Sequence, residues 1–418
     1  MKKNILLIAK DFPPSSESSG VQRILKFSQY LPALNWDVQV LTMQVKAYGK
    51  AVSNDQMADI PDSVVVKRAF AVNTAMHLAV NGRYLSWMAL PDRWMSWVPF
   101  AVLTGLRMIS QQRPAILFST YPCASAHLVG LILHRITGIK WVADFRDPML
   151  YRNDNVKGLQ ARCYAWIERQ TIKYCTRAIF TTPGAIEHYA KLRYSEYPDE
   201  KWVLIANGFD EQNFAQSVMG QTREPSDKQA VVLLHAGYLY RQERDPSAFF
   251  KGLALLFAQG LLKPGDIKIV LRASGFEAEY GEIIKACGLE GVVFLEPSIP
   301  YKKILAEMLA ADGLLLFQGA SCNQQIPAKI YEYFRAKKPV FALTDSEGDT
   351  ASLLRDAGLH TMAPLDDPEN IARNLGAFYQ LLRSGSAPVP TDAFIASQSR
   401  EARTQQLAAL LDGILDAR

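Results

Sequence analysis

The chain has 418 residues, 49% of them hydrophobic and 21% charged, which excludes a disordered or fibrous protein and leaves room for two ordinary domains. Its net charge of +5 is uneven, because residues 1–210 hold 25 Lys and Arg against 16 Asp and Glu, while the remainder holds 21 against 25. The basic first half fits either a solvated surface or attraction to anionic lipid or a phosphorylated acceptor. No basic cluster interleaved with aromatic residues stands out, which argues against nucleic-acid binding.

The five cysteines show no metal-ligand spacing and leave one over from any disulfide pairing, which favours a reducing cytoplasm. The apolar run at 4–9 is short and lacks a small-residue cleavage site, so it predicts a first strand and not a signal peptide. The stretch between Arg113 and Arg135 has no formal charge. Prolines, serines and histidines interrupt it, so we expect strand, loop and helix here and not a membrane span.

Short apolar runs rich in Val and Ile alternate with longer helical stretches, a pattern that predicts βαβ units and parallel sheets. In the first half we expect strands at 4–9, 38–42, 64–67, 115–119, 140–143, 178–181 and 203–206. After a polar linker at 211–229, further strands are expected at 231–234, 267–271, 292–295, 313–317 and 340–343.

This alternation predicts an α/β chain of two tandem Rossmann-like, doubly wound domains, at 1–210 and 230–391. Such sheets bind ligands at the carboxyl ends of their strands, so an interdomain cleft is the expected site. The tail at 392–418 predicts a helix that crosses back to the first domain.

The densest motif, QQIPAKIYEYFRAKKPV, runs from Gln324 to Val340. Pro327 suits the first turn of a helix, whose free N–H groups attract an anion. Glu332, one to two turns into that helix, is suited to bind a vicinal diol such as a ribose. For a lone glutamate the alternative is a solvated charge.

This segment resembles the donor-binding element of retaining GT-B glycosyltransferases of family 4, which carries two glutamates separated by seven residues and a Gly-x-Pro-Val turn. The resemblance implies the GT-B fold, a nucleoside-diphosphate-sugar donor and Glu332 as the ribose ligand. Gln324 replaces the first glutamate, which contacts the donor sugar or supports catalysis in the family; a glutamine cannot ionise but can still hydrogen-bond the sugar. Pro327 replaces the usual glycine. The Pro-x-Lys-x-Tyr-Glu-Tyr variant, which includes Lys329, resembles a subgroup that acts in surface polysaccharide synthesis.

A second motif, HAGYLYRQERDP at 235–246, follows the first strand of the second domain. Gly237 permits a tight turn close to a phosphate, and Arg241 or Arg244 is suited to clamp a diphosphate, as a basic residue of this loop does in the family. Ser274 and Gly275 follow the next strand, where the family has a glycine-rich turn near the nucleotide base. A simple strand-to-helix turn is the alternative there.

In the first domain, a loop containing Gly20 leads into a helix, and the resemblance places this loop against the donor phosphates and the acceptor. Arg146 and Asp147, in the run Asp144-Phe145-Arg146-Asp147-Pro148, follow a strand and are expected at the rim of the cleft on the acceptor side. A salt-bridged structural turn is the alternative. We include His127 in this acceptor loop group, although one face of a helix explains it better than catalysis.

An aromatic-rich stretch of the first domain runs from residue 85 to residue 100. It contains Leu85, Trp87, Met88, Trp94, Met95, Trp97 and Phe100. Such residues suit either a membrane interface or packing within the domain.

The resemblance, taken with these motifs, implies a cytoplasmic retaining hexosyltransferase that moves a sugar from a nucleoside-diphosphate-sugar to a saccharide or lipid-linked acceptor, and we expect peripheral contact at the inner membrane face. Gln324, Arg241 and Lys329 are the candidate catalytic residues. No cofactor or metal is expected, since neither an Asp-x-Asp dyad nor a His/Cys cluster occurs. The alternatives are a sugar-nucleotide epimerase of the same fold and a non-catalytic GT-B binding or scaffold protein, which Gln324 favours.

Overall fold

The computed structural model describes residues 3–15, 20–49, 51–79, 81, 83–150, 157–215 and 230–417. The chain forms two compact units, which we call the first domain (Met1–Asn207 with Arg400–Arg418) and the second domain (Gly208–Ser399). Of the expected linker at 211–229, residues 216–229 lie outside the described part, and a short helix, α7 (Glu211–Ala215), precedes them.

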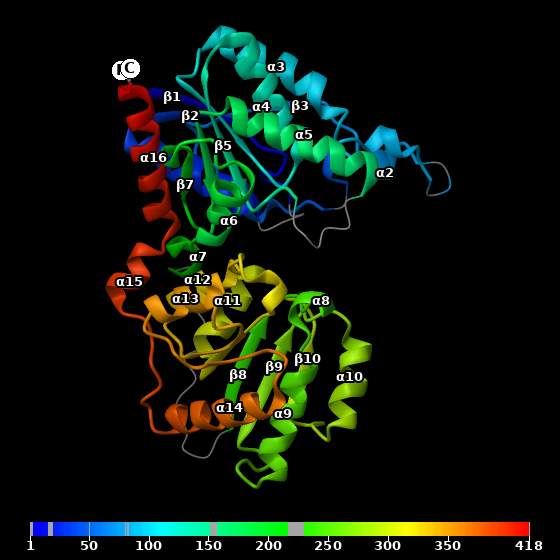
Figure 1. The fold of residues 1–418 in the computed structure, drawn as a ribbon, viewed down its shortest axis with the longest axis vertical. Coiled ribbons are helices and arrows are strands. Elements are labelled where there is room, and N and C mark those ends of the chain that lie inside the picture. Colours follow the sequence, from blue (N-terminus) through cyan, green and yellow to red (C-terminus); the bar gives the residue numbers. More distant parts are fainter. Residues whose placement is uncertain are drawn as a thin grey trace. The chain divides into compact units, whose positions relative to one another are not determined.

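The first domain is built on a fully parallel sheet, whose described strands run in the order β3-β2-β1-β4-β5-β6-β7 (Figure 1). The strands are β1 (Lys3–Ile8), β2 (Trp36–Met43), β3 (Val65–Ala69), β4 (Ile116–Thr120), β5 (Lys140–Arg146), β6 (Arg177–Phe180) and β7 (Trp202–Leu204). The helices are α1 (Gly20–Tyr30), α2 (Thr74–His77), α3 (Trp97–Gln111), α4 (Ala124–Thr137), α5 (Gly158–Tyr174), α6 (Pro183–Glu187) and α16 (Arg400–Asp416). Short helical turns are η1 (Leu31–Leu34), η2 (Val45–Tyr48), η3 (Asn54–Asp59), η4 (Ser86–Ala89), η5 (His188–Arg193) and η6 (Asp199–Lys201).

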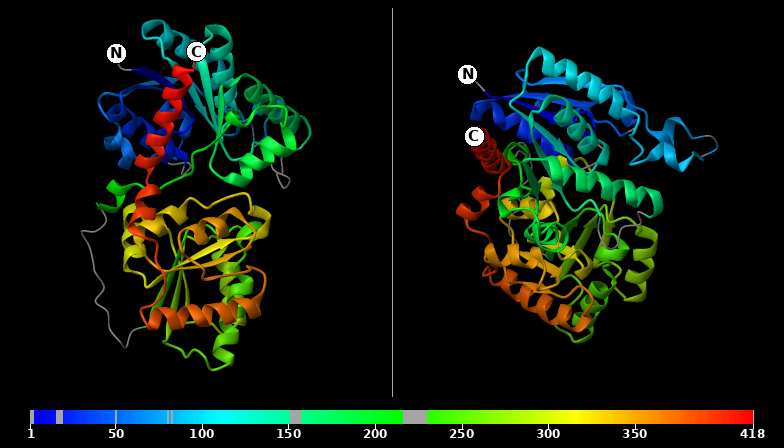
Figure 2. Two further views of the ribbon diagram at one scale, coloured as in Figure 1. Left: turned by 60° about the vertical axis from the view of Figure 1, so that its left-hand side comes forward. Right: turned by 45° about the horizontal axis from the view of Figure 1, so that its top comes forward.

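The side chains of successive residues in each buried strand pack into two different hydrophobic cores, because they alternate between the two faces of the sheet. In β1, Leu6 and Ile8 join the core that contains residues of α3, α4 and α5. Ile5 and Leu7 join the opposite core, which includes residues of α1 and α16. The C-terminal helix α16 therefore completes one face of the first domain, where Figure 2 shows it beside α1.

The second domain repeats the plan with a parallel sheet in the order β10-β9-β8-β11-β12-β13. Its strands are β8 (Val231–Ala236), β9 (Ile267–Arg272), β10 (Val293–Glu296), β11 (Gly313–Gln318), β12 (Val340–Thr344) and β13 (Met362–Ala363). Its remaining helices are α8 (Arg241–Arg244), α9 (Ser247–Ala258), α10 (Glu277–Ala286), α11 (Tyr301–Ala310), α12 (Lys329–Ala336), α13 (Asp349–Asp356), α14 (Pro368–Arg383) and α15 (Asp392–Ser397), with the turn η7 (Ala320–Cys322). Helices α9 and α14 pack against each other over one face, and α11 contacts α12 and β8.

The predicted fold class is confirmed, since both domains are doubly wound parallel sheets. Every expected strand is present, and the two-residue strand β13 was not predicted. The uncharged stretch forms β4, a loop and α4, as expected. Among the described helices, none is both long and apolar enough to cross a membrane.

In each sheet the strand order reverses beside the first strand of the domain, between β1 and β4 and between β8 and β11. Doubly wound sheets bind ligands outside the carboxyl ends of their strands at this switch point. The chain segments that follow β1, β4, β8 and β11 are therefore the places to look for a site.

Candidate functional site

A partly buried lysine lies at the switch point of the second domain. Lys329, the first residue of α12, places its Nζ 3.2 Å from Nε2 of His235 in β8. The imidazole is wholly buried, and its Nδ1 lies 2.9 Å from the carbonyl oxygen of Leu315 in β11. Its Nε2 also lies 3.0 Å from the carbonyl oxygen of Gly237. Burial, together with the nearby Lys329 charge, holds the pKa of His235 well below its usual range, so the ring is neutral.

Burial and the nearby Arg244 guanidinium lower the pKa of Lys329 to about 7, while Glu332 opposes the shift. Gly237 provides the space for the ammonium, because a Cβ at this position would lie 2.9 Å from Lys329 Nζ. Gly237 also has a φ of +113°, a backbone conformation that favours glycine. The structure thus brings together four residues that the sequence singled out, namely Gly237, Arg244, Lys329 and Glu332.

The two arginines of α8 have different surroundings. Arg244 donates from Nε to Oε1 of Gln318, the last residue of β11, at 3.1 Å. Arg241 forms an ion pair of 2.7 Å with Glu279, and both side chains are about half exposed. Of these two arginines, Arg244 is the one whose charge lowers the pKa of Lys329.

Arg241 instead borders a hollow of about 670 Å³. Its wall includes Ser321 of η7 and Asp345, which follows β12. Acidic groups predominate there, since Glu243, Asp245, Asp345 and Asp366 face Arg241 and Lys251.

Glu332 lies in the first turn of α12 and not one to two turns into the helix, because the helix begins at Lys329. Its Oε1 accepts a hydrogen bond of 2.6 Å from the hydroxyl of Tyr301, the first residue of α11. The side chain is partly exposed, and its charge is close enough to raise the pKa of Lys329. The Glu332 carboxylate thus belongs to a residue one helical turn after Lys329.

The prediction that Pro327 occupies the first turn of this helix was wrong. Pro327 precedes the N-cap residue, Ala328, and its carbonyl accepts from the N–H of Ile330 at 3.0 Å in a tight turn before the helix. The N-cap residue itself, an alanine, makes no side-chain capping hydrogen bond. Gln324 lies in the segment between η7 and α12 and is partly buried.

The turns after β8 and β9 are joined by backbone hydrogen bonds. Leu239 N–H donates to Ser274 O at 2.8 Å, which places the predicted pair Ser274 and Gly275 beside the Gly237 turn. Ser274 is wholly buried, and its Oγ has no hydrogen-bond partner within the described residues. Gly275 has a φ of +69°, and a Cβ there would lie 2.3 Å from the ring of Tyr238. Only glycine fits at this position.

In the first domain, Gly20 and Arg146 line one small cavity at the carboxyl edge of the sheet. Its other lining residues are Lys10, Asp11, Thr120, Tyr121, Pro122 and Cys123. Arg146 ends β5 with a φ of +64°, and its Nη1 donates to Tyr121 O at 3.2 Å. Its Nε is buried without a hydrogen-bond partner in the described part of the chain. The structure thus brings two of the predicted acceptor-side residues together.

The run from Asp144 to Asp147 does not place all its charges at the rim. Asp144 is wholly buried, where its carboxylate accepts two hydrogen bonds from the Arg23 guanidinium, at 2.9 and 3.0 Å, and one from Thr120. For Asp144 the salt-bridged structural alternative therefore holds. Asp147 follows the strand, and burial raises the pKa of its carboxyl while Arg146 opposes the shift.

His127 does not line this edge. Its side chain is wholly buried in α4, with Nδ1 2.8 Å from Ser119 Oγ and the ring packed against Phe145. Burial lowers the pKa of His127 to about 3, so it is neutral at physiological pH. Its place in the acceptor group is thus corrected, because a core histidine presents no group to a ligand.

The aromatic stretch is divided between core and surface. Trp94 and Trp97 are buried, whereas Trp87 is 63% exposed and Phe100 is 44% exposed. Packing within the domain therefore holds for Trp94 and Trp97, while Trp87 and Phe100 are exposed at the surface.

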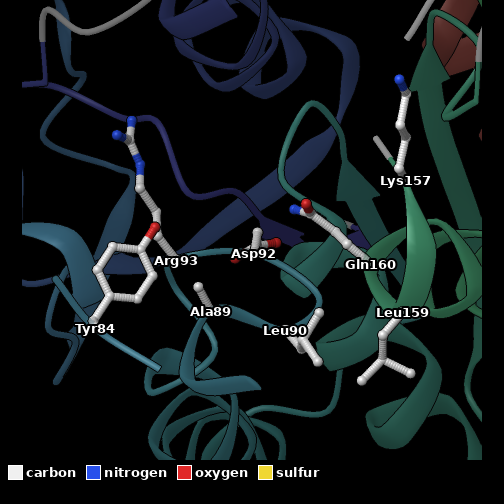
Figure 3. A pocket seen from close by; sticks show the side chains of 8 residues that line it. All are labelled: Tyr84, Ala89, Leu90, Asp92, Arg93, Lys157, Leu159 and Gln160. Carbon is white, nitrogen blue, oxygen red and sulfur yellow. The ribbon is translucent and has the colours of Figure 1, made fainter. Parts of the chain in front are cut away.

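The same stretch borders a hollow that the sequence did not indicate (Figure 3). The hollow has about 510 Å³ and is lined by Tyr84, Ala89, Leu90, Asp92, Arg93, Lys157, Leu159 and Gln160. Asp92 is held by the N–H and hydroxyl of Ser125, both at 2.9 Å. Residues before and at the start of α5 form the opposite wall. The sequence did not indicate this hollow because Arg93 and Lys157, which lie on its two sides, are far apart in the chain and share no motif.

Comparison with known proteins agrees with the two-domain fold described above. Residues 20–208 match the glycosyl transferase 4-like domain family. No curated protein sequence matches the chain. Sucrose-phosphate synthase from Thermosynechococcus elongatus has a similar structure over 100% of both chains, with 14% identity and a TM-score of 0.63.

Two further solved structures have the same fold. HepE from Anabaena, in complex with UDP, is 15% identical over 98% of this chain and 100% of its own, with a TM-score of 0.65. The α,α-trehalose 6-phosphate synthase from Burkholderia multivorans is 12% identical over 100% of both chains, also with a TM-score of 0.65. At these identities the likeness establishes the two-domain GT-B fold.

Proposed function

We propose that this chain, whose residues 20–208 belong to the glycosyl transferase 4-like family and whose fold is GT-B, transfers a sugar from a nucleoside-diphosphate-sugar to an acceptor hydroxyl. One observation carries the proposal. A lysine, Lys329, lies partly buried at the switch point of the second sheet, and the charge of a second partly buried cation, Arg244, lowers its pKa. Two neighbouring cations that are partly withdrawn from water favour a polyvalent anion, and a diphosphate is the anion that this fold binds at that edge.

The reaction breaks the bond between the anomeric carbon of the sugar and the diphosphate oxygen. Negative charge develops on that oxygen as the bond breaks. Lys329 and Arg244 stabilise the charge electrostatically, and they are already in position before the reaction. These cations supply the neutralisation that a metal ion supplies in other transferases, so we propose a reaction without metal or cofactor.

Glu332 is proposed to bind the ribose of the donor. Its carboxylate lies one turn beyond Lys329, which matches the order of phosphate and ribose in a nucleoside diphosphate. The Tyr301 hydroxyl donates to Oε1 of Glu332 and orients the carboxylate. A diol bound to an oriented carboxylate makes charge-assisted hydrogen bonds, each stronger than a neutral one.

Retention of configuration and the role of Gln324 are further parts of the proposal, and they rest on the family resemblance. The amide of Gln324 is suited to hydrogen-bond the donor sugar, since it offers both a donor and an acceptor. An acid-base role is excluded for an amide. The sugar is therefore positioned at this residue, and proton transfer from the acceptor hydroxyl belongs to another group.

The acceptor is proposed to bind at the carboxyl edge of the first sheet, near Gly20 and Arg146. A saccharide or lipid-linked acceptor fits the excess of basic residues in the first half and the exposed side chains of Trp87 and Phe100. Together these features support peripheral contact with an anionic membrane and a cytoplasmic role in surface polysaccharide synthesis. Flotation with anionic liposomes tests the contact, and an enzyme that stays with the soluble fraction would refute it.

The central experiment screens nucleotide sugars for thermal stabilisation and then measures sugar transfer. A donor that binds only the folded state raises the melting temperature, by an amount that grows with the ratio of ligand concentration to Kd. We expect one class of nucleotide sugar to stabilise the protein and to release its nucleoside diphosphate when acceptor is added. The configuration of the product then tests retention. Donor binding without release at any acceptor would favour the scaffold alternative, and release of an epimerised free sugar would favour the epimerase.

A further inference from the structure

The hollow of Figure 3, which we call the α5 hollow, has walls that are tied to two helices. Asp92 accepts two hydrogen bonds of 2.9 Å from Ser125 at the start of α4. The carbonyl of the preceding residue, Pro91, accepts one of 3.2 Å from Nε2 of Gln160 in the first turn of α5. These bonds hold the two walls at a fixed separation, so the space of about 510 Å³ between them is built into the fold.

The exposed side chains that line the α5 hollow are of two kinds. Arg93 and Lys157 are exposed cations, and Figure 3 shows them on opposite sides of the hollow. Tyr84 and Leu159 are large and mostly apolar, and they are 40% and 59% exposed. The lining has these two cations against one carboxylate, that of Asp92, so it carries a net positive charge.

The exposed apolar surface continues from the α5 hollow onto the turn η4. Leu85 and Trp87 lie in the chain between the lining residues Tyr84 and Ala89, and they are 60% and 63% exposed. Single exposed apolar side chains need no explanation, but a group of them beside a hollow indicates a binding surface. Because this group adjoins two cations, the surface suits a ligand that is apolar at one end and anionic at the other.

Two contacts join the α5 hollow to the small cavity at the carboxyl edge of the first sheet. Cys123 lines that cavity, and its Sγ donates to Oδ2 of Asp92 in the hollow at 3.4 Å. The Trp94 ring is shared by both, since its centroid lies 5.4 Å from Nζ of Lys10 in the cavity and 5.5 Å from the guanidinium of Arg93 in the hollow. The anionic end of a ligand in the hollow is therefore close to the edge where we propose that the acceptor binds.

We infer that the α5 hollow binds a lipid phosphate, that is, a phosphate group esterified to a hydrocarbon chain. The phosphate lies between Arg93 and Lys157, whose long side chains are exposed and turn toward it, and the chain lies over Leu159 toward Trp87. Arginine and lysine are the cations that bind phosphate oxygens best. This inference rests on the proposed function and deepens it, because it makes the acceptor a saccharide that is carried on a lipid phosphate.

The polar side chains of the α5 hollow argue against a free saccharide as the ligand. A free saccharide presents many hydroxyls, which need hydrogen-bonding side chains in the site. The carboxylate and the amide of the lining, Asp92 and Gln160, are engaged with Ser125 and the Pro91 carbonyl. The cations and apolar groups that remain match the two ends of an amphiphile.

The test measures the binding of dodecyl phosphate to the whole protein by calorimetry, below the concentration at which this probe forms micelles. We expect Arg93→Ala and Lys157→Ala each to weaken binding about tenfold, because a charge-assisted contact is lost. Leu159→Ala should weaken it about threefold, because apolar contact with the chain is lost. Arg107→Ala and Leu192→Ala are the matched controls and should bind as the unaltered protein does, since both side chains are exposed in the same domain and lie outside the lining.

Two further probes separate the ends of the ligand. Dodecyl maltoside has the same chain with an uncharged head, and inorganic phosphate has the charge without the chain. We expect the unaltered protein to bind each of them at least about tenfold more weakly than dodecyl phosphate, since each lacks one of the two kinds of contact.

Several results would overturn the inference. Folded Arg93→Ala and Lys157→Ala variants with unchanged affinity for dodecyl phosphate would place its site elsewhere. Equal binding of dodecyl maltoside would indicate an apolar surface alone, and equal binding of glucuronate would indicate a site for acidic saccharides. If the variants lost only their sedimentation with phosphatidylglycerol vesicles, the two cations would serve a membrane surface and not the hollow.

The affinity for UDP and other nucleoside diphosphates keeps this test separate from that of the proposed function. A protein that binds these nucleotides but not dodecyl phosphate keeps its donor site and loses the inference about the α5 hollow. A protein that binds dodecyl phosphate but no nucleoside diphosphate has no donor site, so the proposed function fails and the hollow is a lipid site without a transferase.

Discussion

Raising the pH should weaken diphosphate binding through a single residue, Lys329. Its pKa of about 7 means that the ammonium is about 90% charged at pH 6 and about 10% charged at pH 8 in the empty site. A bound diphosphate needs the charged form and restores the lysine's usual pKa. Binding should therefore be about tenfold weaker at pH 8 than at pH 6, and at pH 8 each binding event should take up about 0.9 proton.

Calorimetry in buffers of different ionisation enthalpy measures this proton uptake directly. The diphosphate titrates as well, so the control is Lys329→Arg, which keeps the charge at every pH in this range. We expect the variant to lose the proton uptake at pH 8 and to retain only the pH dependence of the ligand. His235 does not interfere, because its pKa lies well below this window. Equal proton uptake in both proteins would refute the assignment.

The same pKa fixes the sign of the effect on stability. Without ligand, the unfolded chain holds the Lys329 proton up to a pH of about 10.5 and the folded protein releases it at about 7. Between these values the unfolded state binds more protons, so the contribution of this group to the free energy of unfolding rises with pH. Below about pH 7 both states are charged and the full penalty of burying the charge remains. Saturating diphosphate should abolish this dependence.

Four further substitutions test three separate predictions. Glu332→Ala should weaken donor binding more than about tenfold in equilibrium titrations, because roughly 1.5–3 kcal/mol of charged hydrogen bonding to the ribose disappears; unchanged affinity would count against the ribose assignment. Arg244→Ala should weaken nucleoside-diphosphate binding about tenfold or more while Arg241→Ala changes it less than twofold, and the reverse order would reassign the diphosphate ligand. Asp144→Asn should lower the melting temperature by about 10 °C, since it leaves Arg23 charged and buried without its partner, a loss of about 3–5 kcal/mol; a melting temperature within 2 °C of the unaltered protein's would exclude a structural ion pair.

The strands were predictable because each is a short apolar run, and the parallel order follows from the helices between them. The donor residues Gly237 and Lys329 were predictable because motif and strand end coincide. The distinction between Arg241 and Arg244 was not, because it depends on Glu279, which lies on the next helix but one. A sequence motif does not indicate which side of a short helix faces a ligand.

Two other differences arise from where elements end. Asp144 was expected at the rim, but β5 continues to Arg146 with an irregular register beside β6, so Asp144 remains inside the strand. His235 was not singled out as a functional residue, since a histidine within an apolar run is typical of a core position. Its significance appears only once Lys329, 94 residues later, is found to lie against it. Long-range partners of this kind leave no periodic signal.

Backbone strain provides a criterion for the site that is independent of charge. Among the described non-glycine residues with positive φ, those that are neither asparagine nor a helix C-cap are Arg146, Ala273 and Phe276. All three follow or end strands at the carboxyl edge of a sheet, Arg146 at β5 and the others after β9. Structural strain serving only the fold would have no reason to collect at one end of both sheets, whereas ligand binding at those ends requires side chains in fixed and unusual directions. In the second sheet the strain of Ala273 and Phe276 and the partly buried cations Lys329 and Arg244 mark the same edge on separate physical grounds, which supports the donor site proposed there.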